Sequence, residues 1–148
     1  MNSGKGKNPK PCEIELSPAA EAAYLGFRDR ASRALERGET TNYHISAFNI
    51  VNDAFRLIQA NPEDRKYALT GELSCIYRIK KGRMRICWVV VPDGRICVLF
   101  ISETPRKDGD AHDPYAIFTK MVMSGQFDNL FDELGVGIPK QIEPYRLQ

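Results

Sequence analysis

Five of the eight residues from 78 to 85 are lysine or arginine, and this is the part of the sequence best equipped for chemistry. A guanidinium group donates two parallel hydrogen bonds to phosphate oxygens, a geometry that an ammonium group does not match. The residue types therefore favour a phosphate-bearing ligand. The five cations are Arg78, Lys80, Lys81, Arg83 and Arg85.

The charge around these cations is uneven. Ten Lys or Arg residues and three acids lie between Arg65 and Lys107, although the net charge of the whole chain is only +2. A strand that is charged only for solubility is expected to carry acids among its cations. From Arg78 to Lys107 the only acids are Asp93 and Glu103. The pattern favours an anion-binding surface over an ordinary solvated face.

A β-hairpin is expected to position these cations. If Lys81-Gly82 is a two-residue loop, Lys80 lies opposite Arg83 and Arg78 lies opposite Arg85. Because strand side chains alternate, the four cations then share one exposed face. Like charges placed directly opposite each other destabilise a hairpin, and a bound polyanion would explain them. The other face is apolar and is expected to pack on helices, with Cys75, Tyr77, Ile79, Met84, Ile86 and Trp88.

The flanking sequence predicts an α+β fold. A short strand and two helices precede a three-stranded antiparallel meander, and a helix follows it, with one more short helical or turn segment around Phe127 to Leu134. The expected strands are 12–16, 73–80, 83–91 and 95–102, and the expected helices run from Ser17-Pro18 to Gly38, from about Ser46 to Asn61-Pro62, and from Asp113-Pro114 to Ser124-Gly125.

Length and composition indicate one globular domain. The chain has 148 residues, of which 43% are hydrophobic and 27% charged. We expect a flexible basic tail at 1–11, the domain at 12–134 and a C-terminal extension at 135–148. The chain has no long apolar run and no secretory signal, so we expect a soluble, cytoplasmic protein. Its four scattered cysteines and two histidines predict no metal site, no cofactor and no disulfide framework.

Two segments resemble a known family. Residues 69–88 read LTGELSCIYRIKKGRMRICW, similar to the leucine-and-glycine approach and the Y-R-x-R/K-x-G-x-x-R hairpin of the RelE/ParE superfamily of toxins. The order of elements from about residue 12 to 107 also resembles that superfamily. Residues 113–125 read DPYAIFTKMVMSG, similar to the D-x-Y-A-x-F-x-K-M pattern of the YhaV branch.

The resemblance implies a RelE-like fold and a toxin of a toxin–antitoxin pair that cuts messenger RNA, usually on or near the ribosome. Cleavage without a metal requires deprotonation of the 2′-hydroxyl, stabilisation of the extra phosphate charge and protonation of the leaving oxygen. Arg85 resembles the arginine that contacts the scissile phosphate, Lys80 and Arg78 resemble the cations before the turn, and Arg106 resembles a basic residue after the last strand. The implied partner is an antitoxin protein.

Within this reading we expect Lys80 to act as the base, because the neighbouring cations favour loss of its proton. Arg85 is the first choice for transition-state stabilisation, with Arg106 in support. The family's acid-aromatic pair after the hairpin glycine is replaced by Arg83-Met84. The candidates for the second acid–base group are therefore Tyr115, His112 and Glu103. Tyr115 could equally be a packing residue. Arg78, Lys81, Arg83 and Lys107 are the expected RNA-binding residues.

Two other functions are compatible with the sequence. One is a ParE-like inhibitor of DNA gyrase, which has no need of convergent phosphate ligands. The other is a module that binds RNA or DNA electrostatically without cutting it. Tyr77 and Trp88 are assigned to the core, although Trp88 could stack on a base.

Overall fold

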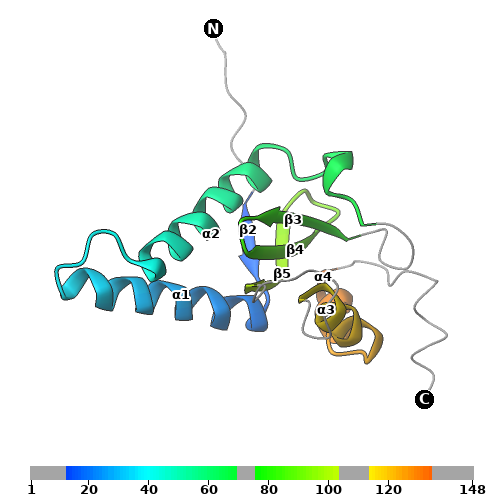
Figure 1. Cartoon of the computed structure of the whole chain (residues 1–148). Coiled ribbons are helices and arrows are strands. Elements are labelled where there is room, and N and C mark those ends of the chain that lie inside the picture. Colours follow the sequence, from blue (N-terminus) through cyan, green and yellow to red (C-terminus); the bar gives the residue numbers. More distant parts are fainter. Residues whose placement is uncertain (1–12, 70–75, 104–113, 135–148) are drawn as a thin grey trace, which may run out of the picture.

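Residues 13–69, 76–103 and 114–134 are described by the computed structural model of the chain (Figure 1). Within these ranges the fold is α+β, as predicted, and none of the helices is long and apolar enough to cross a membrane. The proposed tail and C-terminal extension lie outside them. The elements are β2 (Ile14–Leu16), α1 (Pro18–Glu36), α2 (Tyr43–Ala60), the 3₁₀ turn η1 (Arg65–Tyr67), β3 (Tyr77–Lys81), β4 (Met84–Val90), β5 (Ile96–Glu103), α3 (Pro114–Met123) and α4 (Asp128–Leu134).

The first helix begins and ends as predicted. Ser17 is the N-cap, Pro18 takes the first helical position, and Glu36 is the last residue of α1. Gly38 follows with a φ of +81°, a left-handed conformation that glycine adopts without a Cβ clash.

The second helix starts earlier than the predicted Ser46. It begins at Tyr43, because the side chain of Asn42 caps it by accepting a hydrogen bond from the amide of His44 at 2.7 Å. The helix ends at Ala60, as predicted from the Asn61-Pro62 pair.

The sheet of the described residues has the strand order β2-β5-β4-β3. β3, β4 and β5 form the predicted antiparallel meander, whereas β2 runs parallel to β5. The beginning of the first predicted meander strand, residues 73–75, lies outside the described ranges. β2 therefore lies at one edge of the described sheet and β3 lies at the other.

Hydrophobic cores lie on both faces of the sheet. On one face, β-strand residues such as Ile86 and Trp88 pack with Val51 and Ile58 of α2 and with Phe27 of α1. On the other face, Cys87, Val89 and Leu99 of the strands pack with Phe118 of α3 and with Phe127 and Phe131 near and in α4. Figure 1 shows α1 and α2 together on one side of the strands and α3 and α4 together on the other. The chain thus has three layers.

Trp88 is a core residue, as predicted. Its side chain is fully buried, Tyr67 meets it edge-on at 5.4 Å between ring centroids, and Tyr77 stacks on it at 5.9 Å. The indole nitrogen donates a hydrogen bond to the carbonyl of Pro62 at 2.9 Å. Both the apolar surface and the polar atom of Trp88 are therefore satisfied inside the protein.

Ser17 joins the first helix to the sheet. Its hydroxyl donates to the carbonyl of Leu99 at 2.8 Å and accepts from the amide of Ala20 at 3.0 Å, and its own amide donates to the carbonyl of Val98 at 2.9 Å. The residue is only 1% exposed. The same side chain therefore caps α1 and satisfies a carbonyl of β5.

We expect Ser17→Ala to lower the free energy of unfolding by about 1–2 kcal/mol, because it removes a helix cap and leaves a buried carbonyl without its donor. Urea denaturation followed by circular dichroism measures the change. Ser32→Ala, on the exposed side of α1, is the control and should cost nothing. Equal stability of Ser17→Ala and the wild type would contradict the assigned anchoring role.

Candidate nucleic-acid interface

The hairpin register differs from the predicted one. Lys81 pairs with Met84, so the two turn residues are Gly82 and Arg83 instead of Lys81 and Gly82. Gly82 has a φ of +57°, which the first central residue of a type II′ turn requires, whereas a type I′ turn at Lys81-Gly82 would need a positive φ at Lys81 as well. This requirement places the turn one residue later than we predicted and shifts the strand pairing by two residues.

The shift of two residues changes which residues lie opposite each other but leaves each side chain on its predicted face of the sheet. Lys80 now lies opposite Arg85, and Arg78 lies opposite Cys87, so the predicted pairs of Lys80 with Arg83 and Arg78 with Arg85 are wrong. Arg78, Lys80 and Arg85 still share one face because side chains alternate along each strand. One directly opposed pair of cations, Lys80 and Arg85, remains. We call these three residues, Arg78, Lys80 and Arg85, the cationic row.

The three side chains of the cationic row differ in exposure. Lys80 is exposed, Arg78 is half-buried and Arg85 is only 2% exposed. The expectation that all the hairpin cations are exposed to solvent is therefore wrong for Arg85. This face also carries the core formed with α3 and α4, which reaches the strands at Cys87 and Val89.

The guanidinium of Arg85 is held against the hairpin turn. Its Nη1 donates to the carbonyl of Gly82 at 2.9 Å and to the carbonyl of Met84 at 3.1 Å. Arg85 therefore places a buried positive charge directly beneath the turn and fixes the turn backbone. Sequence reasoning also missed Ser102, which lies opposite Arg85 on β5, because a serine near the end of a strand carries no distinguishing pattern.

The other predicted RNA-binding residues do not all join the cationic row. Lys81 pairs with Met84 on the opposite face of the sheet, and Arg83 is exposed in the turn. Arg106, Lys107 and His112 lie outside the described residues. Tyr115 belongs to the first turn of α3.

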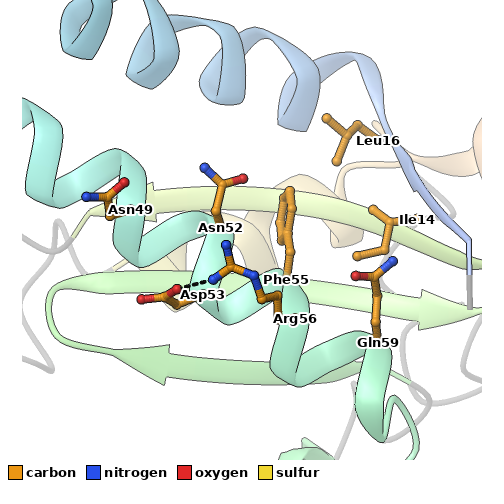
Figure 2. Close-up of a pocket in the computed structure, with 8 residues that line it drawn as sticks. All are labelled: Ile14, Leu16, Asn49, Asn52, Asp53, Phe55, Arg56 and Gln59. Carbon is orange, nitrogen blue, oxygen red and sulfur yellow. Dashed lines mark hydrogen bonds and ion pairs between the residues drawn. The ribbon is translucent and has the colours of Figure 1, made fainter. Parts of the chain in front are cut away.

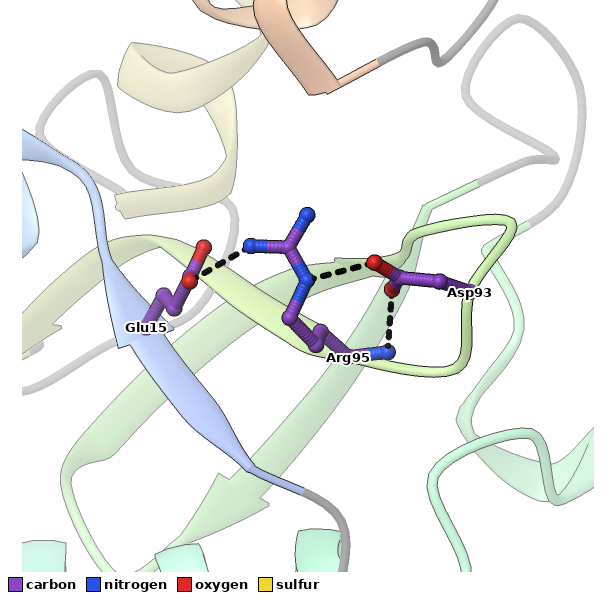
Figure 3. A network of polar contacts seen from close by, with 3 residues as sticks. All are labelled: Glu15, Asp93 and Arg95. Carbon is purple, nitrogen blue, oxygen red and sulfur yellow. Dashed lines mark hydrogen bonds and ion pairs between the residues drawn. The ribbon is translucent and has the colours of Figure 1, made fainter.

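A further cation of this region, Arg95, has partners within the chain. Its Nη1 lies 2.6 Å from a carboxylate oxygen of Glu15, and its Nε lies 2.8 Å from one of Asp93 (Figure 3). The backbone amide of Arg95 also donates to Asp93 at 3.0 Å. These contacts lower the pKa of Asp93 and raise that of Arg95. Arg95 thus joins the β4–β5 turn to β2 and contributes no unpaired charge to a ligand site.

Cys87 lies next to the cationic row but is not suited to nucleophilic chemistry. Burial raises the pKa of its thiol far above the ordinary range, against the opposing effect of the Arg78 charge. Burial also raises the pKa of Cys97 to about 11. Both residues are free thiols. In the ranges that the structure describes, no three His, Cys, Asp or Glu side chains are grouped so that they could hold a metal.

Glu103 lies on the other side of the sheet from the cationic row. It pairs with Met84 at the end of β5, whereas Arg85 pairs with Ser102. Burial raises the pKa of Glu103, and the charge of Arg30 on α1 partly opposes this effect. Of the alternatives for the second acid–base group, Glu103 is therefore not brought onto the face that carries Lys80.

The comparisons with known proteins identify a family. A family model described as a toxin with endonuclease activity, of a toxin–antitoxin system, matches residues 29–137. This range includes the hairpin segment 69–88 and the segment 113–125 that resembles the YhaV branch. Comparison with curated proteins and with solved structures finds no match.

We expect Glu103→Gln to stabilise the protein at neutral pH. The pKa of Glu103 is higher in the folded than in the unfolded chain, so the stability of the wild type falls as pH rises through this range. The advantage of the variant should therefore be present at about pH 7 and shrink toward about pH 4. Denaturation midpoints at both pH values test this, with Glu36→Gln on the exposed side of α1 as control. A constant difference would contradict the assignment.

Proposed function

This chain belongs to the YhaV family of toxins with endonuclease activity, and we propose that it is a metal-independent endoribonuclease that cuts messenger RNA, in association with the ribosome, and is silenced by a cognate antitoxin. We further propose that the fold is of the RelE type, since β2, α1, α2 and the β3–β4–β5 meander follow one another in the order which that resemblance implies. The protein then acts in the cytoplasm, where its substrate is made.

The observation that carries the proposal is the cationic row at the hairpin end of the sheet. Lys80 is exposed, Arg78 is half-buried beside it and Arg85 lies buried directly opposite Lys80. Three positive charges on one face attract a phosphodiester, and partial burial strengthens that attraction relative to a fully solvated site. A gyrase-binding surface would not require such a row.

We assign the chemical roles by exposure. The 2′-hydroxyl oxygen attacks the adjacent phosphorus, and the 5′-oxygen of the next nucleotide leaves, so the products are a 2′,3′-cyclic phosphate and a 5′-hydroxyl. Lys80, in its neutral form, accepts the proton of the 2′-hydroxyl. Arg78 binds the non-bridging oxygens, whose negative charge grows in the transition state. Arg106 and Tyr115 remain proposals for the group that protonates the leaving oxygen.

Arg85 acts differently from the role that the resemblance implies. A guanidinium that is 2% exposed and donates to two backbone carbonyls is not presented to a substrate phosphate in this conformation. Its side chain lies directly opposite Lys80 in the strand pairing, on the same face of the sheet. We therefore propose that Arg85 is a positioning residue, which holds the hairpin turn and so the place of Lys80. Lys81, Arg83 and Lys107 would contact RNA outside the reacting phosphate.

Lys80→Gln is expected to reduce RNA cleavage in EDTA by about 100-fold or more, because it removes the base, and Arg78→Gln by about 10- to 100-fold, because it removes phosphate ligation. Single-turnover cleavage of a defined RNA, with and without ribosomes, measures both effects. Arg33→Gln, an exposed cation of α1, is the matched control. Retention of RNA without cleavage by the wild type would indicate the binding module, and the absence of both would indicate a protein target.

The proposed role of Arg85 predicts a graded effect. Arg85→Gln should lower the free energy of unfolding by about 1–3 kcal/mol, because it removes the group that donates to the carbonyls of Gly82 and Met84. At a temperature where both variants are folded, Arg85→Lys should cleave faster than Arg85→Gln, because it keeps a charged donor. Wild-type cleavage by Arg85→Gln would contradict the proposal.

A further inference from the structure

A groove of about 740 Å³ lies between α2 and β2, on the face of the sheet opposite the cationic row (Figure 2). Ile14 and Leu16 of β2 and Phe55 of α2 supply its apolar part, and all three are only partly buried against the first core. The rest of the groove is lined by polar side chains of α2, namely Asn49, Asn52, Asp53, Arg56 and Gln59.

The polar residues form a stripe along α2. Asn49, Asn52, Arg56 and Gln59 are spaced by three, four and three residues, so they follow one side of the helix. Figure 2 shows this stripe along α2 with Ile14 and Leu16 across the groove on β2. The amide of Asn52 accepts from the hydroxyl of Tyr24 at 2.9 Å and donates to the carbonyl of Phe48 at 3.1 Å. The exposed amide of Asn49 can both donate to and accept from a ligand.

β2 is an edge strand whose outer side accepts no strand from the described part of the chain. The carbonyl of Glu13 accepts from Ile96 and the amide of Ser17 donates to Val98, each at 2.9 Å. In a parallel ladder the residues that bond to one neighbour alternate with those that face away from it. The amides and carbonyls of Ile14 and Leu16 therefore point away from β5, toward the side on which no described strand lies.

The charges of the groove do not favour a nucleic acid. Asp53 and Arg56 form an ion pair with each other, and the other three residues of the polar wall are uncharged amides. RNA binding depends on accumulated positive charge, which this chain has on the other face of the sheet. A strand edge that is unpaired within residues 13–69, 76–103 and 114–134, beside apolar and amide side chains, instead matches an extended polypeptide.

We propose that the β2 edge and the α2 groove bind an extended segment of the cognate antitoxin, which adds a strand to the sheet beside β2. This inference rests on the toxin–antitoxin role of the chain and not on RNA being its substrate. The segment is uncharged, with apolar side chains at alternate positions directed toward Ile14, Leu16 and Phe55. A second copy of this chain is a poorer occupant, because two three-residue β2 strands bury far less than the roughly 800 Å² per partner of a stable dimer.

Hydrogen exchange of the full-length chain tests the strand addition. The probe is the antitoxin expressed from the reading frame that adjoins the gene for this chain. Its binding should slow exchange of the amides of Ile14 and Leu16 by roughly tenfold or more. The amide of Ser17 already donates to Val98 and should change little. This alternation distinguishes strand addition from general stabilisation of the fold.

A pair of substitutions tests the groove. Asn49→Lys with Asp53→Lys places two cations where an uncharged segment would lie, and both side chains are exposed, so the fold should persist. We expect the dissociation constant for the antitoxin to rise by roughly tenfold or more. Ser32→Lys with Glu36→Lys is the matched control, because it makes the same kinds of change four residues apart on the exposed side of α1.

The outcomes separate this inference from the proposed nuclease. Protection confined to Ile14 and Leu16, together with weaker binding by the groove variant alone, supports the inference even if the chain does not cut RNA. Failure of the adjoining gene product to bind the chain overturns it. Binding without that protection, or with an equal effect of the control variant, also overturns it and leaves RNA cleavage unaffected.

Discussion

Burial of β4 and β5 on both faces is the constraint on which the rest of this structure depends. From Met84 to Val89 every residue of β4 is buried, because α1 and α2 cover one face of the sheet and α3 and α4 cover the other. A strand covered on both sides has no room for solvated charge along its length. Charged groups that serve a ligand are therefore confined to the β3–β4 hairpin, where Lys80, Gly82 and Arg83 are exposed.

The hairpin accommodates a cluster of cations because their side chains differ in solvent exposure. Arg85 lies in the buried strand and donates from Nη1 to two backbone carbonyls, whereas Lys80, directly opposite, reaches solvent. A buried guanidinium bonded to the turn is a fixed charge, and its field is less screened than that of a surface side chain. Lys80 and Arg85 repel each other across the hairpin, and a phosphate bound nearby would reduce this repulsion.

The elements and faces of this fold could be predicted from the sequence, but the hairpin register and the exposure of its cations could not. Alternation of apolar and charged residues assigns Ile86 and Trp88 to one face and Arg78 and Lys80 to the other. A shift of two residues preserves this assignment, so alternation cannot distinguish the two registers. The conformation required of Gly82 decides between them.

Arg85 illustrates the second limit. An arginine between Met84 and Ile86 is expected to be exposed, because charged residues are rarely buried. Its burial depends on carbonyls of the turn and on helices that follow much later in the chain. The groove beside β2 was missed for a similar reason, since the stripe of amides on α2 resembles an ordinary solvated helix surface until β2 is placed next to it.

The parallel pairing of β2 with β5 also orders the events of folding. The β3–β4–β5 meander joins neighbours in sequence, so its contacts can form early and locally. β2 must instead close a long loop, since Ser17 and its acceptor Leu99 are 82 residues apart. β2 is synthesised long before β5, so β2 cannot take its place in the sheet until the meander has been made.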